Sequence, residues 1–199
     1  MGRTYDAIDE RWKQWISEQH LFFVATAPKA GEFVNCSPKG LEALRVLGDR
    51  EVAYIDFVGS GAETIAHVRE NGRITLMFCA FAGPPKILRL YGRGEACVPG
   101  DAAWDDLAAH FPDYENVRSI VRVRVDRIAD SCGYGVPRMD YQGERPQLAD
   151  WAASKTKQGL VDYQLANNLE SLDGLPALRA EGLRPRGGSV PRSGDAECS

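Results

Sequence analysis

Residues 119–128 contain the most regular period-two alternation of the chain, and this pattern constrains the fold more than any other feature. Side chains that alternate in this way lie on opposite faces of a β-strand, with the apolar face buried. The apolar positions are Val121, Val123 and Val125, and the polar positions are Arg122, Arg124 and Asp126. The segment is therefore predicted to be a strand with one face in the core.

Further apolar segments bounded by turn residues have the composition of strands. They cover residues 21–27, 33–37, 50–58, 73–81 and 86–98, and Gly92 and Gly94 predict a bulge or bend in the last of them. Helices are predicted only at residues 7–19, 60–71, 101–109 and 146–170. Most strands are joined by short connections, so a regular βαβ alternation is excluded. We predict a mainly β (α+β) fold, an antiparallel barrel or sandwich with accessory helices.

The composition is that of a globular protein with a single domain. The chain has 199 residues, of which 44% are hydrophobic, enough for one core. We predict one domain over residues 1–181, and a disordered tail over residues 182–199, which are rich in Gly, Pro, Arg and Ser. The net charge of −4 argues against a general nucleic-acid binder.

The location expected from the sequence is the cytoplasm. The chain contains neither an apolar run long enough to span a bilayer nor an N-terminal apolar signal core. Five irregularly spaced cysteines without a C-x-x-C pair disfavour both a disulfide framework and a metal site. We therefore expect no metal and no membrane partner.

The segment from residue 33 to residue 72 carries the candidate binding chemistry. A strand that ends in Lys39 precedes a second strand, which leads into a Gly/Ser turn and a helix. Ser60 and Glu63 fit a capping box, with Ser60 as N-cap, and Asn71-Gly72 fits a helix end. Unpaired amides at a helix N-terminus attract a phosphate, such as that of a nucleotide or cofactor.

Each of these residues also has a purely structural interpretation. Ser60 is either a phosphate ligand or only a helix cap, and Thr64 either donates to a phosphate or lies on the helix surface. Lys39 and Arg89 are either ligand contacts or solvated charges, and Arg89 is also a candidate for a dimer contact. His67 is expected to be structural, because no cysteine or carboxylate lies at ligand spacing from it.

Six motifs, in this order, resemble those of the pyridoxamine 5'-phosphate oxidase-like flavoproteins. They are FFVATA at 22–27, VNCSPKG at 34–40, VAYID at 52–56, GSGAET at 59–64, RITLMF at 73–78 and LRLYGRG at 88–94. The similarity extends over roughly residues 5–178 and includes residues 132–137 and 171–176.

The resemblance implies an FMN-binding split barrel that works as a homodimer, with the flavin at the subunit interface. It places the strand over residues 34–39 beside the flavin ring, and the turn that contains Ser60 near the phosphate. The implied cofactor-binding residues are Asn35, Ser37, Pro38, Lys39, Ser60, Gly61, Ala62, Thr64 and Arg89. Ser37 would bond the ring, the amides of Gly61 and Ala62 would meet the phosphate, and Lys39 and Arg89 would supply positive charge.

The departures from the true oxidase bear on the substrate. That enzyme has an Arg-x-Val-Leu-Leu-Lys strand and a Ser-Arg-Lys turn, where this chain has residues 34–39 and 60–62. Its Arg-rich substrate segment is replaced by LDGLP at 172–176. The resemblance therefore supports FMN binding more strongly than it supports pyridoxamine phosphate as the substrate. We predict an FMN-dependent oxidoreductase with a small-molecule donor and hydride transfer to flavin N5. The alternative is a non-catalytic protein that binds flavin, deazaflavin or heme, and no residue is assigned as acid or base.

Overall fold

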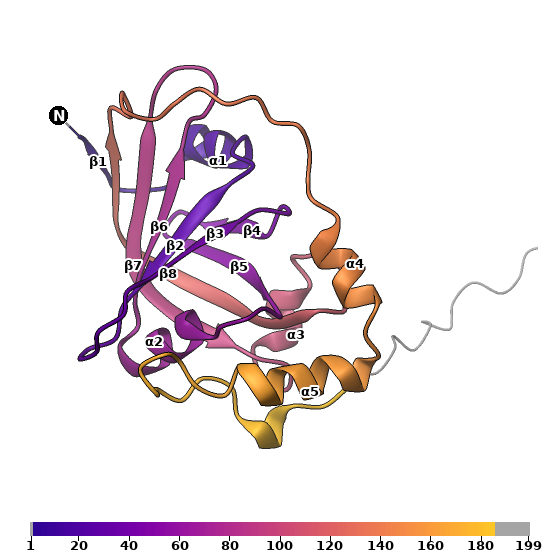
Figure 1. The fold of residues 1–199 in the computed structure, drawn as a ribbon. Helices are drawn as coiled ribbons and strands as arrows, with labels where there is room; N and C mark the ends of the chain where they lie inside the picture. The colour runs from indigo at the N-terminus through magenta and orange to yellow at the C-terminus, as the bar shows by residue number, and fades with distance from the viewer. Residues whose placement is uncertain (1, 186–199) are drawn as a thin grey trace, which may run out of the picture.

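An eight-stranded antiparallel sheet forms the frame of the protein in a computed structural model that describes residues 2–185 (Figure 1). The sheet runs in the order β3-β2-β6-β7-β8-β5-β4, and β1 also pairs with β8. The strands are β1 (Thr4–Tyr5), β2 (Phe22–Thr26), β3 (Asn35–Lys39), β4 (Leu44–Gly48), β5 (Glu51–Phe57), β6 (Arg73–Cys79), β7 (Ile87–Cys97) and β8 (Val117–Ser131). The predicted mainly β (α+β) class, an antiparallel sheet with accessory helices, is confirmed.

Two strands were missed in the sequence. The two residues of β1 are too few to show a pattern, and every residue of β4 is half-buried, so β4 has no alternation between an apolar and a polar face. The strand predicted at 33–37 begins two residues later, at Asn35. The strand predicted at 119–128 extends in both directions to form β8, the longest strand.

Five α-helices and one 3-10 turn accompany the sheet within residues 2–185. They are α1 (Glu10–Ser17), α2 (Glu63–Asn71), α3 (Trp104–Ala108), α4 (Gln147–Ala153), α5 (Lys157–Asn167) and the turn at Ala180–Gly182. Helices α2, α3 and α5 lie toward one end of the sheet, and α1 lies toward the other (Figure 1). The single helix predicted over residues 146–170 is wrong, because Thr156 adopts an extended backbone and its hydroxyl caps α5 by accepting from the Gly159 amide.

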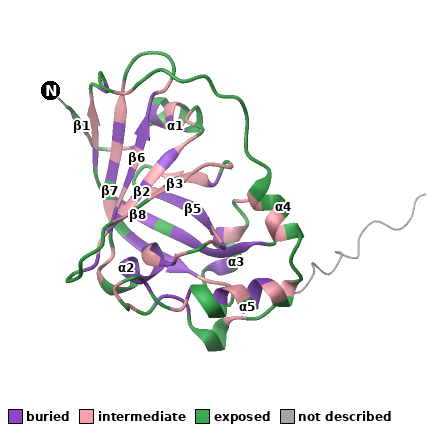
Figure 2. Ribbon diagram, viewed as in Figure 1, coloured by how far each residue is buried: buried purple, intermediate pink, exposed green. Residues whose placement is uncertain are grey.

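The main core lies on the concave side of the sheet, where β2, β6, β7, β8 and β5 each contribute alternate residues (Figure 2). Val24, Leu76, Leu90 and Val123 are completely buried there, and full burial of such a side chain stabilises the fold by about 1.5–3 kcal/mol. A smaller cluster packs α3 against the opposite side of β5 and β8. The valine face predicted for residues 121–125 is therefore confirmed as a core face.

The bulge predicted near Gly92 is present. Its close backbone contact leads to a prediction for the stability of a Gly92 variant. The β7–β8 register shifts between Tyr91 and Gly92, and a Cβ at Gly92 would overlap the Arg124 carbonyl. We expect Gly92→Ala to lower the free energy of unfolding by about 1–3 kcal/mol, because the two backbones must separate. Gly135→Ala is the control, since nothing lies within 4 Å of its added Cβ. Equal urea midpoints for the two variants would contradict the prediction.

The segment after α5 returns to the barrel. Ala177 and Leu178 are buried in the main core, and Leu183 packs against it. The Arg69 guanidinium donates to the Ala177 carbonyl, which fastens this segment to α2. Residues 182–185 of the predicted tail are therefore described here, whereas its remaining residues lie outside the described part of the chain.

Candidate functional site

Strand β3 is an edge strand that pairs only with β2, and it directs three polar side chains toward the barrel interior. Asn35, Ser37 and Lys39 lie opposite the buried residues Thr26, Val24 and Phe22, in that order. Paired residues of antiparallel strands point to the same face. The polar sequence of β3 is thus explained by its position over the mouth of the barrel.

Asn35 organises one end of this strand. Its Nδ2 donates to the Thr26 hydroxyl at 3.2 Å and to the Thr64 hydroxyl at 3.0 Å, while Ser37 donates to Asn35 Oδ1 at 2.9 Å. The bond to Thr64 joins β3 to the first turn of α2. Thr64 is buried, so it does not lie on the helix surface, which was one of its two predicted positions.

His67 extends this network into the core. Its Nδ1 lies 2.9 Å from the Thr26 hydroxyl, and the side chain is buried. Thr26 already accepts a bond from Asn35, so its own proton is free to go to Nδ1, which leaves the ring proton on Nε2. Burial lowers the pKa of His67, and the ring is therefore neutral near pH 7. This buried position is in keeping with the structural role expected for His67.

Lys39, at the other end of β3, belongs to a buried ion network. Its Nζ lies 2.7 Å from Asp56 Oδ1, and Arg118 Nε lies 2.9 Å from Asp56 Oδ2. Burial alone would raise the pKa of Asp56, but Arg118 and Lys39 together outweigh it and lower that pKa to about 2. Two cations around one carboxylate leave one net positive charge near the end of β3.

The turn before α2 differs from the predicted capping box. The helix begins at Glu63 with Ala62 at the N-cap and no side-chain cap, so the prediction of Ser60 as N-cap is wrong. The Gly59 carbonyl accepts from Asn168 Nδ2 at 2.9 Å and from Arg118 Nη1 at 3.4 Å. These distant residues hold Gly59 in place, and Ser60 is exposed ahead of the helix.

A groove of about 370 Å³ opens between the start of β3 and this turn. Asn35, Ser60 and Gly61 line it, so the structure brings these three predicted residues together. Ser37 reaches the groove only through its bond to Asn35, and Ala62 is buried as the helix cap. A volume of this size is at the lower limit of small-molecule sites.

The remaining walls of the groove come from residues that were not named as cofactor-binding residues, although Val34 and Cys36 belong to the strand expected beside the flavin ring. Phe33, Val34 and Leu172 provide apolar surface, and Cys36 and Glu63 complete the lining. Leu172 follows α5 in the chain, and no local pattern connects it with β3. A sequence signal did exist for Phe33 and Val34, two large apolar residues placed just before a polar strand.

Three predicted residues lie away from the groove. Lys39 and Pro38 are at the opposite end of β3. Arg89 lies on the outer face of β7, separated from β3 by β2 and β6, which corresponds to roughly 14 Å at the usual strand spacing. Arg89 Nη1 donates to the Ser131 hydroxyl at 3.2 Å, and no carboxylate of residues 2–185 pairs with it. Within one chain, Arg89 therefore does not reach the groove.

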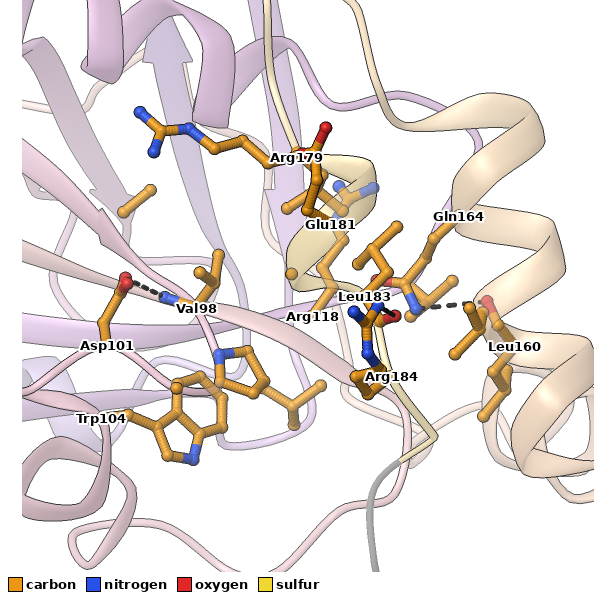
Figure 3. A pocket seen from close by; sticks show the side chains of 18 of the residues that line it. Val98, Asp101, Trp104, Arg118, Leu160, Gln164, Arg179, Glu181, Leu183 and Arg184 are labelled. Atoms are coloured by element: carbon orange, nitrogen blue, oxygen red, sulfur yellow. Dashed lines mark hydrogen bonds between the residues drawn. The ribbon is translucent and has the colours of Figure 1, made fainter.

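A second and larger cavity, of about 1500 Å³, lies under α5 (Figure 3). Gln164 of α5 lies on one side of it and Asp101 and Trp104 on the other, with Arg118 between them. Both acidic and basic side chains line it, so it has no dominant charge. Arg118 connects this cavity to Lys39 through Asp56.

Within residues 2–185, no group of three or more His, Cys, Asp or Glu side chains is arranged to hold a metal ion. The same part of the chain contains no helix that is both long enough and apolar enough to cross a bilayer.

The antiparallel split barrel, with a polar edge strand beside a helix N-terminus, defines the class of protein. Residues 8–132 match the family described as Pyridoxamine 5'-phosphate oxidase. The chain belongs to this family, and the resemblance noted from its motifs is confirmed.

A curated relative and two solved structures are similar to the chain. The "Pyridoxamine 5'-phosphate oxidase family protein ustO" of Aspergillus flavus is 38% identical over 92% of this chain and 80% of its own length. A HupZ variant from Group A Streptococcus is 22% identical, with a TM-score of 0.50 over 62% of this chain and 99% of that one. An FMN-binding protein from Syntrophomonas wolfei is 17% identical, with a TM-score of 0.42 over 59% and 80%.

Proposed function

We propose that this protein is a homodimeric flavin-dependent oxidoreductase of the cytoplasm, with the flavin ring beside β3. The observation that carries the proposal is the polar edge of β3 opening onto a groove, in a chain of this family. A bound flavin would supply hydride acceptance at its N5 atom. The four cysteines of the described residues are free, in keeping with a reducing compartment.

The residues of β3 fit a flavin ring. The Ser37 proton is directed to Asn35, so the Ser37 oxygen is left as an acceptor for a ring N–H group. The net positive charge of the Lys39–Asp56–Arg118 network would favour a reduced, anionic ring nearby. These residues bind and orient the ring, and no described side chain is assigned as acid or base.

Residues of the same chain do not fit the phosphate of FMN. The Glu63 carboxylate lies against Gly61, where the phosphate was expected, and no Lys or Arg of residues 2–185 lines the groove. Lys39, the cation expected there, is paired with Asp56.

The outer face of the sheet supports the homodimer. Phe23 and Ala25 of β2 and Thr75 and Met77 of β6 are half-buried and uncharged, and they form adjacent cross-strand pairs. An uncharged sheet face of this kind suits contact with a second copy of the chain.

The test is whether the protein retains a flavin. We expect purified protein mixed with riboflavin or FMN to keep the absorption bands of oxidised flavin after removal of free ligand. We expect Ser37→Ala to weaken binding about fivefold to tenfold, because a ring hydrogen bond is lost. Ser17→Ala, on the exposed face of α1, is the control. Protein that binds neither flavin would refute the proposal.

A non-catalytic flavin protein is the second candidate. It is favoured by the lining of the groove, where Cys36 and Glu63 are the only titratable side chains that residues 2–185 contribute. Anaerobic mixing of the flavin-loaded protein with NADH, NADPH or pyridoxamine phosphate separates the two functions. Bleaching of the flavin absorbance by any of these donors supports the oxidoreductase, whereas persistent absorbance with all three supports the carrier or sensor.

A further inference from the structure

The groove beside β3 has an apolar wall made of side chains from distant parts of the chain. Phe33, Val34 and Leu172 are 49%, 75% and 72% exposed, so each keeps apolar surface available to a ligand. Leu172 reaches the groove because Asp173 accepts from the Glu32 amide at 3.0 Å, which joins the segment after α5 to the loop before β3. A ligand that covers these side chains gains apolar contact.

The charge of the groove is negative. Glu63 is the first residue of α2, and its carboxylate lies over Gly61 and thus over the helix N-terminus. A carboxylate in that position interacts favourably with the helix dipole, as a bound phosphate would. No salt bridge to Glu63 occurs within residues 2–185, and the lining of the groove contains no cation. The Glu63 carboxylate therefore occupies the position at the N-terminus of α2 where a bound phosphate would lie.

We infer that this groove receives an uncharged, partly apolar group of the ligand and rejects a phosphate, and that Glu63 makes this selection. The inference rests on the proposed flavin site and specifies the chemistry of its ligand. Val34 and Gly61 support it, because both stand where the true oxidase pattern has an arginine, and the structure brings both into this groove. Both arginines of the oxidase pattern are thus replaced by uncharged residues in this groove, where the Glu63 carboxylate also lies.

Riboflavin and FMN provide the direct test, because they share one ring system and differ only in the phosphate. We expect the wild-type protein to bind riboflavin at least as tightly as FMN, measured by quenching of flavin fluorescence. We expect Glu63→Gln to shift the affinity ratio about tenfold toward FMN, since the like charge is removed. Val34→Arg should shift it by a similar factor through a charged hydrogen bond.

Two control variants separate the charge effect from general damage. Leu165→Arg adds the same charge on α5 at an exposed apolar position outside the groove, and it should leave the ratio unchanged. Leu172→Ser should weaken both flavins alike, because it removes apolar surface and no charge. Circular dichroism of each variant checks that the fold is retained.

The outcomes separate this inference from the proposed function. A wild-type preference of tenfold or more for FMN would overturn the inference and leave the flavin proposal standing. The inference would also be overturned if neither Glu63→Gln nor Val34→Arg changed the ratio of the affinities for riboflavin and FMN. Binding of neither flavin would refute the inference and the proposed function together.

Discussion

Asp56→Asn is expected to lower the free energy of unfolding by about 3–5 kcal/mol, because it leaves the buried Arg118 and the half-buried Lys39 without their carboxylate. Asp56 is 1% exposed and bridges Lys39 and Arg118. Urea unfolding followed by circular dichroism measures the loss. Asp126→Asn is the matched control, since Asp126 is exposed and lies 4.0 Å from Arg93, and it should change the stability by less than about 0.5 kcal/mol. A loss below about 1 kcal/mol for Asp56→Asn would contradict the assigned role.

The same carboxylate predicts how stability varies with pH. Its pKa in the folded protein is about 2, below the ordinary value of 3.8. A depressed carboxyl pKa stabilises the fold above the unfolded pKa, and this contribution is lost as the pH falls from about 4 toward 2. The contribution amounts to about 2 kcal/mol. The wild-type protein should lose this stability between pH 4 and pH 2, whereas Asp56→Asn should not show this component.

Phe23→Glu is expected to raise the dissociation constant of the proposed dimer about a hundredfold or more. Phe23 lies between Pro38 and Met77 on the outer face of the sheet, and these neighbours offer no cation to a new carboxylate. A charge buried at such an interface costs several kcal/mol, and each 1.4 kcal/mol corresponds to about a factor of ten. Sedimentation velocity at several protein concentrations measures the constant.

Two further variants make the dimer test specific. Ala25→Glu introduces the same charge one row away and removes almost no packing, so it should dissociate the dimer without lowering the melting temperature. Leu165→Glu, on α5, should leave the dimer intact. A wild-type protein that sediments as a monomer at all concentrations would refute the proposed dimer. If the flavin lies at the interface, flavin binding should fall together with dimerisation.

The elements that could be predicted are those determined by neighbouring residues. The alternation at Val121, Val123 and Val125 marks a core face, because the side-chain period of a strand is local. Gly72 ends α2 with a φ of 73°, a left-handed conformation that glycine adopts without strain. The bulge at Gly92 is likewise local, since two glycines interrupt an otherwise apolar strand.

The parts that could not be predicted depend on contacts between distant residues. Residues 60–63 have the sequence pattern of a capping box, yet the structure forms none, because Asn168 and Arg118 hold Gly59 and α2 begins only at Glu63. A charged residue inside the apolar strand at 52–57 was a signal that Asp56 has partners. The identity of Arg118, 62 residues away, required the fold. Leu172 reaches the groove through a contact of the same long-range kind.

The groove draws its lining from three separate parts of the chain, at residues 33–36, 60–63 and 172. During synthesis the first two parts leave the ribosome long before the third, so a nascent chain lacks one wall of the groove even after the central strands have emerged. Pairing of segments distant in sequence is slow, because loop closure costs entropy before contacts compensate for it. A chain that ended before residue 172 would therefore lack the wall of the groove that Leu172 provides.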